Sequence, residues 1–173
     1  METYHVLFLC TGNSARSIMA EALLNHWGGG RFRALSAGSQ PKGTVHPMAL
    51  EVLERCHLPT AGMRSKSWNE FSQPGAPPLD FVFTVCGNAA SEKCPFWPGH
   101  PATAHWGVDD PAAVEGTRED KLRAFNRALR ELEGRIKLFV GLPFASLDEM
   151  ALRERLLAIG RAEPASTDTE SQQ

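Results

Sequence analysis

The chain has 173 residues, of which 42% are hydrophobic and 22% charged, and its formal net charge at neutral pH is −2. This length predicts one domain with a sizeable core. The near-balanced charge gives no reason to expect nucleic acid or a membrane surface as a partner. The N-terminus has no basic segment before a long apolar stretch, so we expect no signal peptide, no membrane span and a cytoplasmic location.

Apolar runs and hydrophobic periodicity predict strands that alternate with helices. We expect strands at 6–9, 32–37, 81–85 and 102–106, and helices at 17–27, 46–58, 118–139 and 146–159. Thr117 and Asp120 form a predicted capping box, and Ser146 is the expected start of the last helix. Trp27 and Cys56 are expected to face the core. The alternation predicts a three-layer α/β fold in residues 1–160, with a four-stranded parallel sheet and helices on both faces. The polar tail 161–173 is expected to be disordered.

The first strand runs directly into a polar loop and then into a helix. The connecting residues are Cys10-Thr11-Gly12-Asn13-Ser14-Ala15-Arg16-Ser17. In such a turn the backbone N–H groups of residues 11–16 and the positive end of the helix are able to bind a tetrahedral oxyanion. Arg16 adds a planar pair of donors for two of its oxygens.

Cys10 lies at the base of this loop and is the candidate nucleophile. A helix N-terminus and neighbouring cations lower the pKa of a cysteine from about 8.5 into a range of about 3.5–7.5, so we expect a thiolate at neutral pH. Ser17 is expected to donate a further hydrogen bond to the sulfur. A cysteine at a strand end is commonly only a small buried side chain, but the order of strand, glycine-containing loop and helix favours the catalytic interpretation.

A thiolate beneath a bound oxyanion allows two reactions. With phosphorus at the centre, the leaving oxygen needs a proton and water then hydrolyses the covalent intermediate. With a reducible centre such as arsenic, a second thiol attacks the first sulfur and releases the reduced oxyanion. The second reaction consumes additional cysteines.

Cys86 and Cys94 are the candidates for these additional thiols. Cys86 ends the third predicted strand, at the same edge of the sheet as Cys10, and Cys94 follows in a long loop, residues 87–101, so thiol–disulfide exchange is able to pass outward along them. A zinc site formed by the two cysteines with His100 and His105 is the alternative. Its spacing matches no common zinc motif, so no metal site is expected.

A carboxylate after the fourth strand is the candidate proton donor. Asp110 precedes Pro111 in a loop where an acid is able to protonate a departing oxygen, and Asp109 is its rival. An aspartate before proline is more commonly only a turn former.

These residues together resemble a known family. The first loop, Ser36-Ala37-Gly38, Thr84-Val85-Cys86, Cys94-Pro95 and 105–111 are similar to the arsenate reductases built on the low-molecular-weight tyrosine phosphatase fold. The resemblance implies that Cys10 attacks arsenate while Arg16 and the amides of Thr11, Gly12, Asn13, Ser14 and Ala15 bind its oxygens. It also implies that Asp110 donates the proton, that Asn13 shapes the loop and that Ser17 supports the thiolate.

The resemblance further implies a disulfide relay that serves arsenic detoxification. Cys86 attacks Cys10 and releases arsenite, and Cys94 then takes over the disulfide for an external reductant, either thioredoxin or glutathione with glutaredoxin. No bound cofactor is implied. Many relatives carry a further cysteine where this chain has Ala15, so a disulfide within the loop is excluded.

Two rival functions follow from the same residues. The first is a low-molecular-weight tyrosine phosphatase. Such enzymes usually place aromatic residues after the Asp-Pro pair, whereas this chain has Ala112 and Ala113. The second is an oxyanion-binding or redox-sensing module without turnover.

Overall fold

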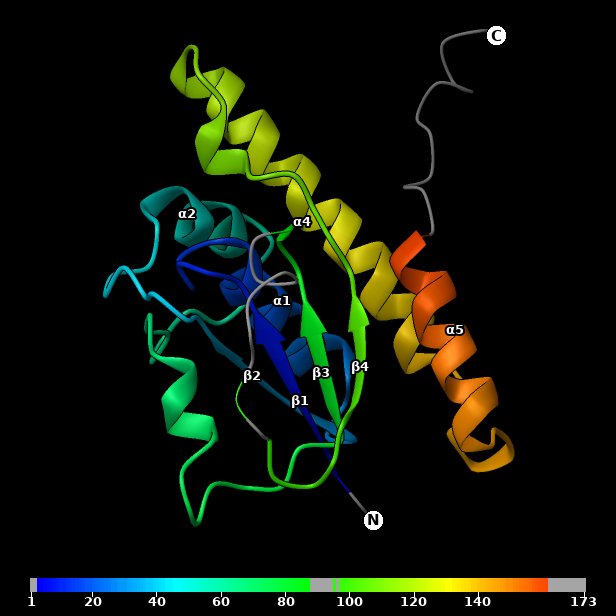
Figure 1. Cartoon of the computed structure of the whole chain (residues 1–173). Coiled ribbons are helices and arrows are strands. Elements are labelled where there is room, and N and C mark those ends of the chain that lie inside the picture. Colours follow the sequence, from blue (N-terminus) through cyan, green and yellow to red (C-terminus); the bar gives the residue numbers. More distant parts are fainter. Residues whose placement is uncertain (1–2, 88–94, 96, 162–173) are drawn as a thin grey trace, which may run out of the picture.

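The computed structural model describes residues 3–87, 95 and 97–161. Its centre is a parallel sheet of four strands in the order β2-β1-β3-β4 (Figure 1). The strands are β1 (Tyr4–Leu9), β2 (Phe32–Ala37), β3 (Phe81–Thr84) and β4 (Ala102–His105). The predicted α/β class, with its four parallel strands, is therefore confirmed.

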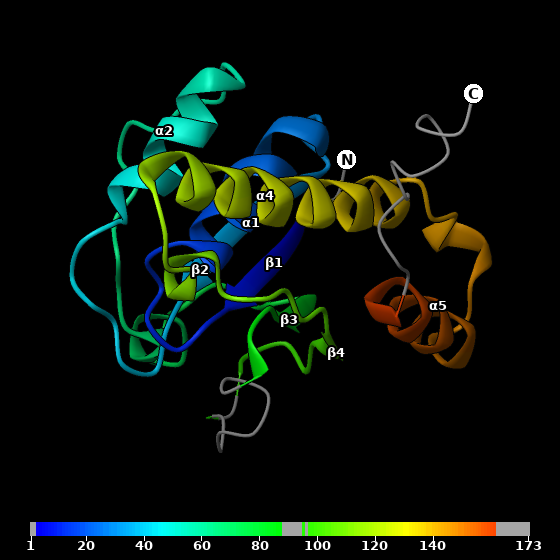
Figure 2. The same ribbon diagram turned by 90° about the horizontal axis from the view of Figure 1, so that it is seen from above.

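Helices pack against the sheet and along its edge. They are α1 (Arg16–Trp27), α2 (Pro47–Arg55), α4 (Arg118–Val140) and α5 (Glu149–Arg161), with 3-10 turns η1 (Trp68–Phe71), η2 (Pro111–Ala113) and η3 (Phe144–Ser146). Helices α1 and α4 lie side by side over one face, and α5 lies beside β4 (Figure 2). Within the described residues, no helix is both long and apolar enough to cross a membrane.

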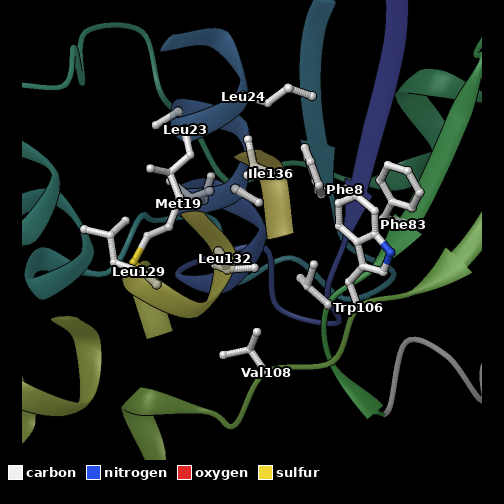
Figure 3. Close-up of a cluster of buried hydrophobic side chains, with 14 of the residues drawn as sticks. Phe8, Met19, Leu23, Leu24, Phe83, Trp106, Val108, Leu129, Leu132 and Ile136 are labelled. Atoms are coloured by element: carbon white, nitrogen blue, oxygen red, sulfur yellow. The ribbon is translucent and has the colours of Figure 1, made fainter. Parts of the chain in front are cut away.

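The alternation of side chains along β1 separates two hydrophobic clusters, because successive residues of a strand point to opposite faces. Val6 and Phe8 join the large cluster beneath α1 and α4, part of which Figure 3 shows. Leu7 and Leu9 join a smaller cluster on the other face, where Phe71 of η1 packs. Both faces of the sheet are thus covered, which fits the continuous apolar run in this strand.

The edge strand β4 is covered by α5. The indole Nε1 of Trp106, directly after β4, donates a buried hydrogen bond of 3.0 Å to the Leu156 carbonyl of α5, and its ring stacks on Phe83 at 3.7 Å. Gly160 lies so close to β4 that a side chain there would overlap the His105 carbonyl. This covering protects an edge that would otherwise be open to pairing with another chain.

The predicted start of α4 is confirmed, whereas the predicted start of α5 is two residues early. Thr117 and Asp120 form the capping box in both directions. At α5 it is Asp148, not Ser146, that caps the helix, through a 2.7 Å bond from the Ala151 N–H to its carboxylate.

Two residues expected in the core lie at the surface. Cys56 is exposed because α2 ends at Arg55, before the predicted helical face reaches this position. Trp27 is the last residue of α1 and is 41% exposed. Its ring lies under the Lys137 ammonium at 4.4 Å, a cation–π contact on the outside of α4 that a hydrophobic pattern does not reveal.

Candidate active site

Strands β1 and β3 are neighbours, but the chain leaves their carboxyl ends in opposite directions, toward β2 and β4 respectively. Ligands of open parallel sheets bind at this kind of switch point. Leu9 pairs with Thr84, so Cys10 and Cys86 both emerge at this edge, and both are buried. The Thr11 N–H donates to the Cys86 sulfur at 3.3 Å. The structure thereby brings the two predicted thiols together.

The loop after Cys10 has the orientation of an anion site. Its carbonyl groups at Thr11, Gly12 and Ser14 accept hydrogen bonds from backbone N–H groups of segment 40–46. Because the C=O and N–H of a planar trans peptide point in opposite directions, the N–H groups of residues 12, 13 and 15 face the interior of the loop. A ring of inward donors of this kind is able to hold a tetrahedral anion.

Asn13 fixes the shape of the loop. Its φ is 42°, a left-handed conformation that asparagine adopts more readily than most residues. The side-chain amide donates to Ser17 Oγ at 2.8 Å, and its oxygen accepts from the Lys66 backbone N–H at 2.9 Å. Ser17 Oγ therefore accepts a hydrogen bond from the residue that shapes the loop, and its donation to the Cys10 sulfur stays a prediction.

Gly38 lets a second segment approach the loop closely. Any side chain at this position would overlap the carbonyl groups of Cys10 and Thr11. The Gly38 N–H donates to the Lys66 carbonyl at 3.0 Å. This close approach explains why a glycine follows β2 and how residues 64–67 come to support the loop.

Lys66 is a functional candidate that the sequence did not reveal. Its side chain is 7% exposed, and its ammonium lies 3.7 Å from the Glu21 carboxylate and 3.4 Å from Ser36 Oγ. Burial lowers the pKa of Lys66 and raises the pKa of Glu21, while each charge opposes the shift of the other. The pair links α1 and β2 to the segment 64–67, which supports Asn13. Lysine and glutamate are so commonly exposed that no sequence pattern indicated this buried pair.

Arg16 and Asp110 face each other across the mouth of the loop. Arg16, the first residue of α1, donates from Nη1 to the Val108 carbonyl at 2.9 Å, and its Nη2 lies 3.7 Å from Asp110 Oδ2. The other carboxylate oxygen of Asp110 accepts from the Ala112 N–H at 3.0 Å. Both rival acids are exposed, and Asp110 is the one paired with Arg16.

The Cys86 side chain is the largest influence on the protonation of Cys10. The contact with the Cys86 side chain, followed by burial, raises the pKa of Cys10, whereas Arg16 and the Gly12 N–H act to lower it. The expected freely ionised thiolate at Cys10 is therefore wrong for this arrangement. Two sulfurs in contact cannot both carry charge, so they titrate as one coupled pair.

Cys94 is outside the described residues. His105 pairs through Nδ1 with Thr84 Oγ1 at 2.8 Å. Throughout the part of the chain that the structure describes, no three His, Cys, Asp or Glu side chains are grouped to hold a metal ion.

Comparison with known proteins accounts for this constellation. The model of the low molecular weight phosphotyrosine protein phosphatase family matches residues 5–152. This chain belongs to the low molecular weight phosphotyrosine protein phosphatase family. The matched residues include the whole anion loop, with Cys10, the inward amides and Arg16.

The relatives of this family member include arsenate reductases. An arsenate reductase of Shouchella clausii is 39% identical over 134 residues, which are 78% of this chain and 93% of that protein. The crystal structure of an arsenate reductase from Archaeoglobus fulgidus aligns with a TM-score of 0.62 at 29% identity, covering 79% of this chain and 99% of the other. A thioredoxin-dependent arsenate reductase of Corynebacterium glutamicum aligns with a TM-score of 0.53 at 26% identity, covering 80% of this chain and 64% of the other.

Proposed function

We propose that this protein is an arsenate reductase that converts arsenate to arsenite in arsenic detoxification. The observation that carries the proposal is the contact between the Cys10 and Cys86 thiols beneath a ring of inward amides. A phosphatase of this fold needs one thiol at this place, whereas a reductase needs a second within reach of the first. The arsenate reductases among the relatives support the same choice.

Arsenate binds in the loop in the first step. The inward amides of residues 12, 13 and 15 and the Arg16 guanidinium hold its oxygens, which places arsenic above Cys10. Arg16 exchanges part of its contact with Asp110 for the anion, and Asp110 protonates the oxygen that leaves as water. Cys10 passes its proton to the bound arsenate, and the resulting thiolate forms the S–As bond as the As–O bond to the departing water breaks.

Cys86 completes the reduction. Its thiolate attacks the Cys10 sulfur, the S–As bond breaks, and its electron pair remains on arsenic, which leaves as arsenite. The two thiols are oxidised to a disulfide and give up two electrons, and arsenic(V) accepts these two electrons to become arsenic(III). The coupled pKa favours this order, because Cys86 ionises most readily once Cys10 is bonded to arsenic and carries no charge.

The relay then passes outward. Cys94 attacks Cys86 and leaves a Cys86–Cys94 disulfide, with Cys10 free for the next cycle. The final electrons come from an external dithiol. We propose thioredoxin, because a structural relative depends on it, and glutathione with glutaredoxin is the alternative.

Replacing each cysteine singly by serine tests the proposal. We expect Cys10→Ser, Cys86→Ser and Cys94→Ser to abolish multiple-turnover arsenite production with either reductant. Cys56→Ser is the matched control, because Cys56 is exposed at the end of α2, and it should retain activity. Continued cycling by Cys86→Ser would contradict the relay, and rapid aryl phosphate hydrolysis without arsenate-dependent thiol loss would favour the phosphatase.

A further inference from the structure

The loop that carries Asp110 is held between two arginines. Gly107 accepts a 2.7 Å hydrogen bond from Arg135 Nη1 of α4, and the next carbonyl, Val108, accepts from Arg16 at 2.9 Å. Both donors therefore act on adjacent peptide groups, one from the helix layer and one from the anion loop. Any shift of residue 107 is transmitted directly to the anchor of Arg16.

Arg135 is unusual because it is buried. Its residue is 9% exposed, and it lies on α4 between Leu132 and Ile136, which are fully buried core residues. Burial lowers the pKa of its guanidinium, opposed by Glu131 one turn earlier. A buried arginine is costly unless it is hydrogen-bonded, and the strong partner it has is the Gly107 carbonyl.

The rest of the loop borders a pocket that is open to solvent. The pocket has a volume of about 240 Å³ and lies between the loop and α4, whose Ala124 and Ala128 line it together with the longer side chains of Arg123, Arg127 and Glu131. Asp110 lies at this open side of the loop. The hydrogen bonds at residues 107 and 108 therefore help to fix the segment that carries it.

We propose that Arg135 is a positioning residue for the anion site. By fixing the Gly107 carbonyl it places the Val108 carbonyl that orients Arg16, and it places Asp110 opposite Arg16. The effect of Arg135 on proton donation by Asp110 rests on the proposed function. Its effect on Arg16 requires only that the loop binds an oxyanion.

The test compares Arg135→Met with Arg130→Met, which alters an exposed arginine of the same helix. Inorganic phosphate is the probe of anion affinity, measured by calorimetry on full-length protein, and kcat and KM are measured with arsenate. Since a displacement of about 1 Å can cost up to about 100-fold in rate, we expect Arg135→Met to weaken phosphate binding and to reduce kcat/KM by about tenfold or more. Arg130→Met should stay within about twofold.

Arg135→Lys separates positioning from a purely structural role. It keeps a cation and one donor toward Gly107, so it should fold and restore part of both the phosphate affinity and kcat. If Arg135→Met or Arg135→Lys melts at a lower temperature but keeps the wild-type phosphate affinity and kcat, the proposal is wrong. Failure of the wild-type protein to reduce arsenate would instead overturn the proposed function, while phosphate affinity would still decide the role of Arg135.

Discussion

Replacing Lys66 by methionine tests whether a buried ion pair supports the anion loop. The substitution keeps most of the unbranched side chain but removes the ammonium, which lies 3.7 Å from Glu21 and donates to the Arg64 carbonyl at 3.1 Å. The Glu21 side chain is only 13% exposed, so its carboxylate loses a partner that water replaces poorly. The variant therefore measures the cost of an uncompensated buried charge.

The expected loss is set by burial and distance. Breaking a buried pair by removing one partner costs about 3–5 kcal/mol, and the 3.7 Å separation places this pair at the lower end. We expect unfolding free energy to fall by about 3 kcal/mol at neutral pH, which corresponds to a melting temperature lower by about 6–12 °C for a chain of this length. Urea unfolding followed by tryptophan fluorescence measures the change.

The pH dependence provides a second signature. Burial raises the pKa of Glu21 and Lys66 lowers it, so in Lys66→Met the pKa rises further above the unfolded value. A group with a raised pKa stabilises the folded state at low pH and loses that contribution as pH rises. The deficit of the variant should therefore shrink as the pH falls, because protonation of Glu21 removes the buried charge.

Lys137→Met is the matched control for this experiment. Its ion pair with Glu133 has the same 3.7 Å separation, but the two side chains are 50% and 36% exposed. Exposed pairs contribute only about 0–1 kcal/mol, and the exposed cation–π contact of Lys137 with Trp27 contributes about 0.5–1 kcal/mol, so this variant should still lose less stability. If Lys66→Met loses no more than the control, or if its deficit is independent of pH, the argument from burial is refuted.

Two further predictions concern the thiol pair and the glycines of the helices. Cys86→Ala should lower the pKa of Cys10, measured by the pH dependence of its alkylation rate, because it removes the contact that raises it; an unchanged or higher pKa would contradict the pairing. Gly134→Ala, on an open face of α4, should stabilise the protein by up to about 1 kcal/mol. Gly160→Ala should instead destabilise it, because the new Cβ would overlap the end of β4; equal effects on the melting temperature would refute this packing of α5.

The sheet and the loop were predictable because local patterns determine them. Buried strands read as continuous apolar runs, and parallel strands end at one edge, so the position of Cys10 and Cys86 followed from the order of elements. The Thr117 and Asp120 cap was equally local. Each apolar run and each helix cap lies within a few consecutive residues, so a single sequence is enough to reveal it.

Other parts of the site depend on tertiary contacts. Lys66 and Arg135 are charged residues that tertiary structure buries, and nothing in their immediate sequence distinguishes them from exposed ones. The raised pKa of Cys10 follows from the distance to Cys86, which depends on strand register. Cys56 was assigned to the core because a helical pattern extends past the true end of α2.

The central claim is that Cys86 attacks the arsenic adduct of Cys10. Treating reduced Cys94→Ser with one equivalent of arsenate, in the absence of external reductant, isolates this step. Mass-spectrometric disulfide mapping should find a Cys10–Cys86 disulfide together with one arsenite released per chain. Arsenite release without that disulfide, or a disulfide that joins Cys10 to Cys56 instead, would contradict the account.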